Sequence, residues 1–176
     1  MTNKKNKPIK DLEYISAYIK REEGFRSNVY KDSLGLYTVG VGHLLPPEGQ
    51  RSPAMWEAAF RARHGADYVQ ALQNLYAIDL AKHINGVARK LFDYDSQSLS
   101  VRTCIASMSF QFGGKLLTYD KTKAMLQDGD FIKLASSLEG WKAMKQTPKR
   151  MRRNQVLLAI NTDDKELIKI CLDASW

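Results

Sequence analysis

The sequence contains few of the residues that define several common protein classes. Among 176 residues there are two cysteines and three histidines. Two cysteines are too few for the disulfide framework of a small secreted domain. The histidines, at positions 43, 64 and 83, have no metal-ligand spacing, and no phosphate-cradling motif is present. We therefore expect neither a metal site nor a cofactor.

Long hydrophobic runs are also missing. No stretch approaches the roughly 20 apolar residues of a membrane span. The basic start, residues 1–7, lacks the apolar segment that follows it in a secretory signal. We expect residues 1–7 to be a disordered basic extension and the chain not to follow the usual export path by its own sequence. Cys104 and Cys171 each lie in an apolar helical pattern, so we expect two buried free thiols and a reducing compartment during folding, with a bridge between them as the alternative.

Acidic residues are scarcer than basic ones. The chain has 27 Lys and Arg against 19 Asp and Glu, a net charge of +8. Such an excess favours an anionic partner, or it serves only solubility. Residues 142–153 carry six basic residues and no acidic one, which is typical of a solvated helix face or of a surface that binds anions. No nucleic-acid-binding module is recognisable, so we expect no nucleic-acid partner.

The apolar pattern predicts a mostly helical single domain, and a chain of this length can bury roughly 70% of its unfolded surface. Pro8 and Gly24 bracket the first predicted helix. A long helix, capped by Asp67, is expected to reach Leu91, about 35 Å at 1.5 Å per residue. Further helices are predicted at 53–65, 98–111, 120–127, 131–140, 149–160 and 164–173.

Residues 28–42 lack the helical apolar pattern. Their sequence is typical of two short strands, 28–32 and 36–42, around a turn at 33–35. Gly40 and Gly42 alternate with valines, so one face of the second strand is predicted to lack side chains. Such a face lets another group approach the backbone closely. Residues 46–49 are predicted to form a loop.

Three polar residues in this region have the right chemistry for hydrolysis of a glycosidic bond. Glu23, Asp32 and Thr38 follow one another at spacings of nine and six. Two carboxylates and a hydroxyl that converge can protonate a leaving oxygen and hold an attacking water. Each residue also has a plain structural interpretation: a solvated helix end, a turn cap and a β-branched strand residue.

His43 ends the glycine-rich segment. A lone histidine is usually structural, and here it could bond to a carboxylate on the long helix, with Asp79 as the candidate. We therefore treat His43 as a supporting residue of the candidate site.

The segment closely resembles the phage-type lysozymes, in particular those of T-even phages. The resemblance rests on residues 23–26, 30–32, 35 and 37–44, and on a second match at 110–113, Trp141 and 146–148, followed by Arg150 and Arg153. The matches are collinear and extend from about residue 12 to 160. The chain departs from the family in residues 1–11, in residues 46–66 and in a longer linker after Trp141.

This resemblance implies an α+β, mostly helical, lysozyme-like fold. It has a small β-hairpin lobe, residues 8–66, and a larger helical lobe, residues 67–176, which includes the long connecting helix, with the active-site cleft between them. It implies a monomeric peptidoglycan glycosidase that cleaves the β-1,4 bond between N-acetylmuramic acid and N-acetylglucosamine. The family's acid falls on Glu23, its aspartate on Asp32 and its threonine on Thr38. The remaining implied positions are Leu44, Phe110 and Gln111 in the cleft, and Arg150 facing the glutamate.

We expect hydrolysis with inversion, in which Glu23 is the acid and Asp32, helped by Thr38, activates water. The alternatives are a lytic transglycosylase, which needs no attacking water, and an inactive wall-binding protein of the same fold. The resemblance also implies synthesis in a host cytoplasm and action on the wall, as an endolysin that a membrane-permeabilising holin releases or as a virion component. The basic lobe would then bind an anionic cell-envelope surface.

Overall fold

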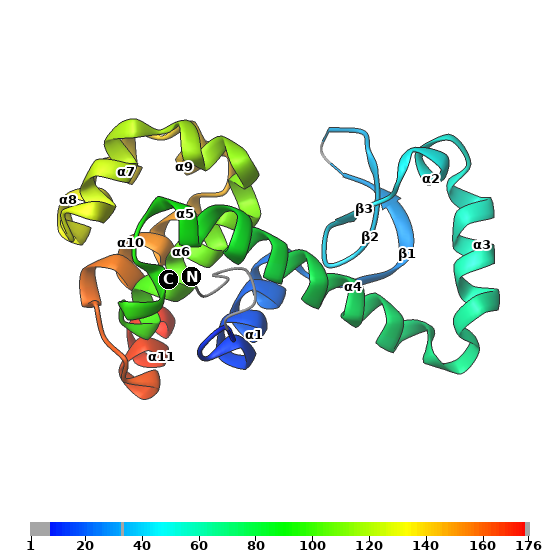
Figure 1. The fold of residues 1–176 in the computed structure, drawn as a ribbon, viewed down its shortest axis with the longest axis horizontal. Helices are drawn as coiled ribbons and strands as arrows, with labels where there is room; N and C mark the ends of the chain where they lie inside the picture. Colours follow the sequence, from blue (N-terminus) through cyan, green and yellow to red (C-terminus); the bar gives the residue numbers. More distant parts are fainter. Residues whose placement is uncertain (1–7, 33, 175–176) are drawn as a thin grey trace, which may run out of the picture. The chain divides into compact units, whose positions relative to one another are not determined.

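The computed structural model of the chain describes residues 8–32 and 34–174, so the predicted extension at residues 1–7 lies outside the described residues. The fold is mostly helical with one three-stranded antiparallel sheet (Figure 1), which confirms the predicted α+β class. The described residues form two compact units. We call residues 16–81 the sheet unit, and residues 8–15 with 82–174 the helical unit. The predicted division at residue 67 stays a prediction; the borders of these units lie inside α1 and α4.

The elements follow the chain in a simple order. From the start of the described chain to the unit border they are α1 (Leu12–Glu23), β1 (Arg26–Lys31), β2 (Tyr37–Gly40), β3 (His43–Leu44), α2 (Pro47–Arg51), α3 (Pro53–His64), the 3-10 turn η2 (Gly65–Asp67) and α4 (Tyr68–His83). The rest are η3 (Ile84–Ala88), α5 (Arg89–Leu91), η4 (Tyr94–Ser96), α6 (Leu99–Phe112), η5 (Gly113–Thr118), α7 (Asp120–Gln127), α8 (Phe131–Ser137), η6 (Leu138–Gly140), α9 (Lys142–Gln146), α10 (Pro148–Ile160) and α11 (Lys165–Asp173).

The sheet differs from the predicted pair of strands. Gly40 and Gly42 have φ angles of 66° and 69°, and they form the tight turn between β2 and a third strand, β3. A Cβ on Gly40 would lie 3.7 Å from Leu72, an ordinary contact distance. The positive φ therefore requires glycine here, and the prediction of one strand through residue 42 with a bare face was wrong. The predicted loop at 46–49 is also wrong, because Pro47 starts the short helix α2.

Helices α2 and α4 hold the sheet. Val39 and Leu45 pack with Tyr68 and Leu72 of α4 in the core of the sheet unit. Gln50 of α2 accepts the N–H of Tyr37 at 2.9 Å and donates to its carbonyl at 2.7 Å. The Gln50 side chain therefore continues the hydrogen-bond ladder along β2.

The predicted long helix is interrupted. Asp67 lies in the turn η2, which leads into α4, and helical backbone reaches Leu91 as predicted. Between α4 and α5, however, residues Ile84–Ala88 adopt π-helical geometry. A π segment inserts an extra residue into a helix, which the apolar periodicity does not reveal.

The helical unit agrees well with the predicted helices. Ser98 caps α6 and Pro148 opens α10, which packs against α6, α8, α9 and α11. The three short elements η4, η5 and α9 were not predicted. Cys104 is a free, fully buried thiol, as expected, and burial raises its pKa. Cys171 forms no disulfide and is only partly buried, so the prediction that it is buried was wrong; the buried residues of α11 are Ile168 and Leu172.

The segment before α1 has a structural role that the sequence did not reveal. The first helix begins at Leu12 and not next to Pro8, because Asp11 has a φ of 53°. Residues 8–11 instead bind two arginines of the helical unit. The guanidinium of Arg102, which is 0% exposed, donates to the Lys10 carbonyl at 2.9 Å and to the Asp11 carboxylate at 2.7 Å. Arg89 donates to the Pro8 carbonyl at 3.0 Å.

The Asp11–Arg102 pair predicts a pH-dependent stability. The hydrogen bond from Arg102 lowers the pKa of Asp11 below its ordinary value of 3.8. A lowered pKa in the folded state contributes stability that is present above pH 3.8 and lost as the pH falls through the folded value. We expect Asp11→Asn to reduce the free energy of unfolding by about 1–3 kcal/mol at pH 7, and the difference from wild type to shrink as the pH falls below 3.8. Urea unfolding between pH 7 and pH 3 measures it.

The matched control is Asp128→Asn, which neutralises an exposed carboxylate at the end of α7. It should change stability little at any pH. If Asp11→Asn lowers the free energy of unfolding by the same amount at pH 7 and at pH 3, the proposed role of the Asp11 charge is wrong.

Candidate active site

Asp32 closes the hairpin between β1 and β2. Its Oδ1 atom accepts the N–H of Leu34 at 2.8 Å and of Leu36 at 2.9 Å. Its carbonyl accepts the N–H of Gly35 at 3.0 Å, and its own N–H donates to Leu36 at 2.9 Å. Asp32 is therefore the turn cap that sequence reasoning offered as the plain alternative. Among the described residues, these side-chain hydrogen bonds all fall on Oδ1, which leaves Oδ2 for another partner.

Thr38 shares a face of the sheet with Asp32. Thr38 is paired with Tyr30 across β1 and β2, and Asp32 follows Tyr30 by two residues. Because side chains alternate along a strand, Asp32 and Thr38 lie on the same face as diagonal neighbours, with Cα atoms about 7–8 Å apart. Thr38 is 4% exposed, and its hydroxyl donates to the Tyr30 carbonyl at 3.4 Å, a long hydrogen bond. The structure thus brings two of the three predicted catalytic residues together.

Leu44 extends this face. It pairs with Thr38 across β2 and β3, and its side chain is 51% exposed. Val39, the next residue of β2, points into the core of the sheet unit. One face of the sheet therefore packs inward, while the other carries Asp32, Thr38 and an exposed leucine. We call this second face the site face.

Glu23 is the last residue of α1, as predicted, and its side chain is partly exposed. The helix ends because Gly24 adopts a φ of 74° and returns its N–H to Lys20 at 2.9 Å. This left-handed cap turns the chain directly into β1. Phe25, the next residue, packs against the core of the sheet unit and fixes the exit of the helix. Glu23 therefore sits at a defined helix end, in the same unit as Asp32 and Thr38.

His43 has the predicted structural partner. Its Nδ1 lies 2.6 Å from the Asp79 carboxylate on α4, and both side chains are about one-fifth exposed. His43 pairs with Val39 across the strands, so it projects from the face opposite Thr38. The pair joins β3 to α4 and so supports the sheet from behind the site face.

The other predicted site residues belong to the helical unit. Phe110 is partly buried and its ring centroid lies 5.0 Å from that of His83. Gln111 donates from Nε2 to the Thr147 hydroxyl at 3.0 Å, and its Oε1 is buried without a hydrogen bond from any described residue. Arg150 is buried and donates to the Ser107 carbonyl at 2.9 Å. Its predicted approach to Glu23 stays a prediction.

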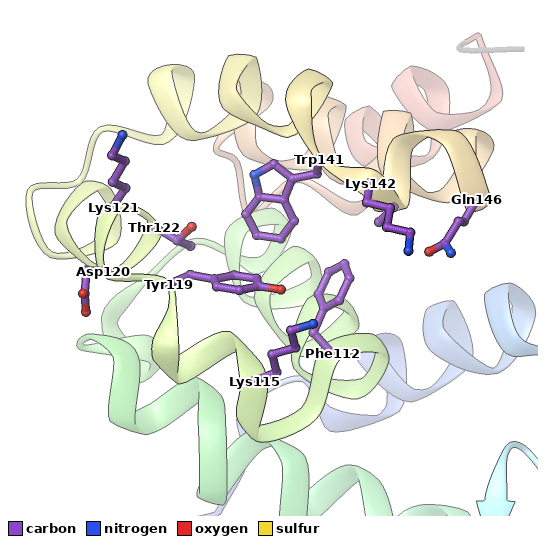
Figure 2. A pocket seen from close by; sticks show the side chains of 10 residues that line it. Phe112, Lys115, Tyr119, Asp120, Lys121, Thr122, Trp141, Lys142 and Gln146 are labelled. Atoms are coloured by element: carbon purple, nitrogen blue, oxygen red, sulfur yellow. The ribbon is translucent and has the colours of Figure 1, made fainter. Parts of the chain in front are cut away.

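The helical unit also contains an aromatic pocket that sequence reasoning missed. It encloses about 680 Å³ between η5, α7 and α9. The ring centroid of Trp141 lies 5.1 Å from that of Tyr119 and 5.4 Å from that of Phe112. Figure 2 shows these rings pointing toward one another, with Lys115 and Lys142 at the edge. The sequence pointed to Phe112 and Trp141 only as parts of the family resemblance and not to a pocket, because the three aromatic residues come from separate elements.

The described residues contain neither a candidate metal site nor a candidate membrane-spanning helix. Within residues 8–32 and 34–174, no three His, Cys, Asp or Glu side chains gather into a group that could hold a metal ion. In the same ranges no helix combines the length and apolar character needed to cross a membrane.

One known protein family matches most of this chain. The Phage lysozyme family matches residues 20–156, a span that contains Glu23, Asp32 and Thr38 as well as Phe110, Gln111 and Arg150. The chain belongs to this family. It is 24% identical over 161 residues to "Probable T4-type lysozyme 1" of Dictyostelium discoideum, which covers 84% of this chain and 94% of that protein. It is 23% identical over 148 residues to "Probable T4-type lysozyme 2" of the same organism, covering 77% and 87%.

Membership in the phage lysozyme family supports a glycoside hydrolase whose substrate is peptidoglycan. The match begins at residue 20, so residues 8–11, which bind Arg89 and Arg102, lie outside it. The matched span also includes Gln111 of α6 and Arg150 of α10. It contains the site-face residues Asp32, Thr38 and Leu44 as well.

Proposed function

We propose that this protein is a lysozyme that hydrolyses the β-1,4 bond between N-acetylmuramic acid and N-acetylglucosamine in peptidoglycan. The observation that carries the proposal is the site face, where Asp32 and Thr38 are diagonal neighbours and the Oδ2 atom of Asp32 is left for water. A lytic transglycosylase has no use for a carboxylate and a hydroxyl that hold water. The geometry therefore favours hydrolysis.

The proposed reaction uses the three residues in separate roles. Glu23 gives its proton to the glycosidic oxygen as that oxygen leaves the muramic acid C1 atom. A water molecule attacks C1 from the opposite side, and Asp32 takes its proton while Thr38 holds it by a second hydrogen bond. This is the inverting arrangement, in which the carboxyl groups are roughly 6.5–9.5 Å apart.

Three further residues are proposed to bind the glycan. Leu44 offers an exposed apolar surface next to Thr38. Gln111 is fixed through Nε2 by Thr147, and its Oε1 is an acceptor that could receive an amide N–H of the substrate. Phe110 is held by the ring of His83. His43 and Arg150 are proposed to support the site through their contacts with Asp79 and Ser107.

We further propose that the helical unit holds the enzyme on an anionic cell-envelope surface. Exposed basic residues lie along α9 and α10, and the edge of the aromatic pocket adds two lysines. They are Lys142, Lys145, Lys149 and Arg152 on the helices, and Lys115 and Lys121 at the pocket. Arg150 is not part of this surface, because it is buried against α6. The sequence cluster at 142–153 thus contains both a buried structural arginine and an exposed basic face.

The proposed biological setting follows from the family. A monomeric lysozyme of this type would be made in the cytoplasm of an infected bacterium and would reach the wall through a holin, or it would be carried in the virus particle. Either route ends at peptidoglycan, where lysis of the cell depends on Glu23 and Asp32.

Lysis of bacterial walls tests the proposed catalytic roles. Glu23→Gln and Asp32→Asn should each lower the rate by at least about 10²–10⁴-fold, because each removes a proton donor or acceptor from the reaction. Asn at position 32 keeps an oxygen for the Leu34 and Leu36 amides, so that variant should unfold at the same urea concentration as wild type. The clearing of a wall suspension measures the rate.

The matched control is Glu13→Gln, which changes an exposed glutamate in the first turn of the same helix. It should lyse walls at the wild-type rate. Full activity in Glu23→Gln would refute the assignment of the acid. Full activity in Asp32→Asn would reduce Asp32 to a turn cap.

Binding to intact walls tests the anionic-surface proposal. In a Glu23→Gln background, which prevents digestion, replacing Lys145 and Lys149 by Gln should weaken binding about 30-fold at low salt, from roughly 1 kcal/mol per lysine near an anionic surface. The difference should shrink as salt rises. Sedimentation of the protein with purified walls measures it. The control, Lys90→Gln with Lys133→Gln, removes the same charge elsewhere on the helical unit, and equal weakening in both pairs would overturn the proposal.

A further inference from the structure

The turn that carries Asp32 depends on one backbone conformation. Gly35 has a φ of 79°, in the left-handed region. A Cβ at this position would meet nothing within 4 Å, so space does not explain the glycine. The N–H of Gly35 bonds to the Asp32 carbonyl at 3.0 Å, the closure of a four-residue turn with Asp first and Gly last. Glycine is therefore needed at position 35 because the backbone there has a positive φ angle.

The two amides that hold the Asp32 side chain flank this glycine. They belong to Leu34 and Leu36, and both donate to the same oxygen, Oδ1. The dihedral angles of Gly35 set the direction of the chain between these amides. A change in those angles would move one donor relative to the other and weaken at least one of the two hydrogen bonds.

Hydrogen bonds around Asp32 hold this turn. The side chains of Leu34 and Leu36 are 80% and 40% exposed. With Oδ1 fixed by two donors, the carboxylate cannot rotate freely, and the direction of Oδ2 is fixed as well.

We propose that Gly35 is a positioning residue for catalysis. Its left-handed conformation keeps the amides of Leu34 and Leu36 on Oδ1, so that Oδ2 faces the attacking water. This inference rests on the proposed function, because it assigns Asp32 to water activation. Asp32 then combines the roles of turn cap and proton acceptor, and the cap sets the geometry of the acceptor.

The main test compares two glycines in one unit. Gly65, at the end of α3, has a φ of 51°, and a Cβ there would also meet nothing within 4 Å. Gly35→Ala and Gly65→Ala therefore both place a Cβ on a residue with positive φ, but only the first lies beside Asp32. We expect Gly35→Ala to lower kcat about 10- to 100-fold with KM unchanged, as for a misplaced catalytic group. Gly65→Ala should keep the wild-type kcat. The substrate is a soluble glycan strand of defined length.

Two further variants separate positioning from stability. Asn tolerates a positive φ much better than Ala, so Gly35→Asn should restore most of the lost kcat. In an Asp32→Asn background, where the proton acceptor is already missing, Gly35→Ala should cause no further loss of the residual rate in prolonged incubations. An additional loss there would show that Gly35 acts independently of Asp32 and would overturn the proposal.

The outcomes distinguish this proposal from the proposed function. If wild type fails to cleave the strand, or if Asp32→Asn is fully active, the function assigned to Asp32 fails and the role of Gly35 falls with it. If Asp32→Asn is inactive while Gly35→Ala and Gly65→Ala have equal kcat, the proposed function stands and the positioning role is wrong.

Discussion

One carboxylate oxygen organises the site face. The Oδ1 atom of Asp32 accepts two amides of the turn and thereby closes the hairpin between β1 and β2. The register that follows pairs Tyr30 with Thr38, and Thr38 with Leu44. Slippage of this register by one residue would send Thr38 into the core and Val39 onto the site face. The chemistry of the site therefore depends on how the hairpin is closed.

Arginine and lysine have different roles in the helical unit. Arg102 and Arg150 are buried, and each guanidinium donates to backbone carbonyls, so the two side chains stabilise the packing around α6. The lysines of α9 and α10 are exposed. Planar guanidinium groups with several donors suit buried carbonyls, whereas a compact ammonium group remains hydrated at the surface. The net charge of +8 thus includes both structural groups and a basic surface.

Local sequence signals predicted much of this structure. Periodicity and capping residues identified α6, α7 and α10, and the turn residues identified the hairpin. The errors arose where one residue type is compatible with two different local structures. Gly40 and Gly42 suggested a bare strand face but form a turn, and Pro8 suggested a helix start but precedes a segment bound to Arg89. The Asp11–Arg102 contact and the pocket around Trp141 join residues far apart in the chain, which a single sequence does not reveal.

The central claim is that the site face delivers water to the muramic acid C1 atom. The most direct measurement is the configuration of the new reducing end, observed by NMR in the first minutes of reaction, before the anomers interconvert. Water held by Asp32 and Thr38 opposite the leaving group predicts an α-configured N-acetylmuramic acid end from the β-linked strand. A β-configured end, or a 1,6-anhydro end formed without water, would contradict the account.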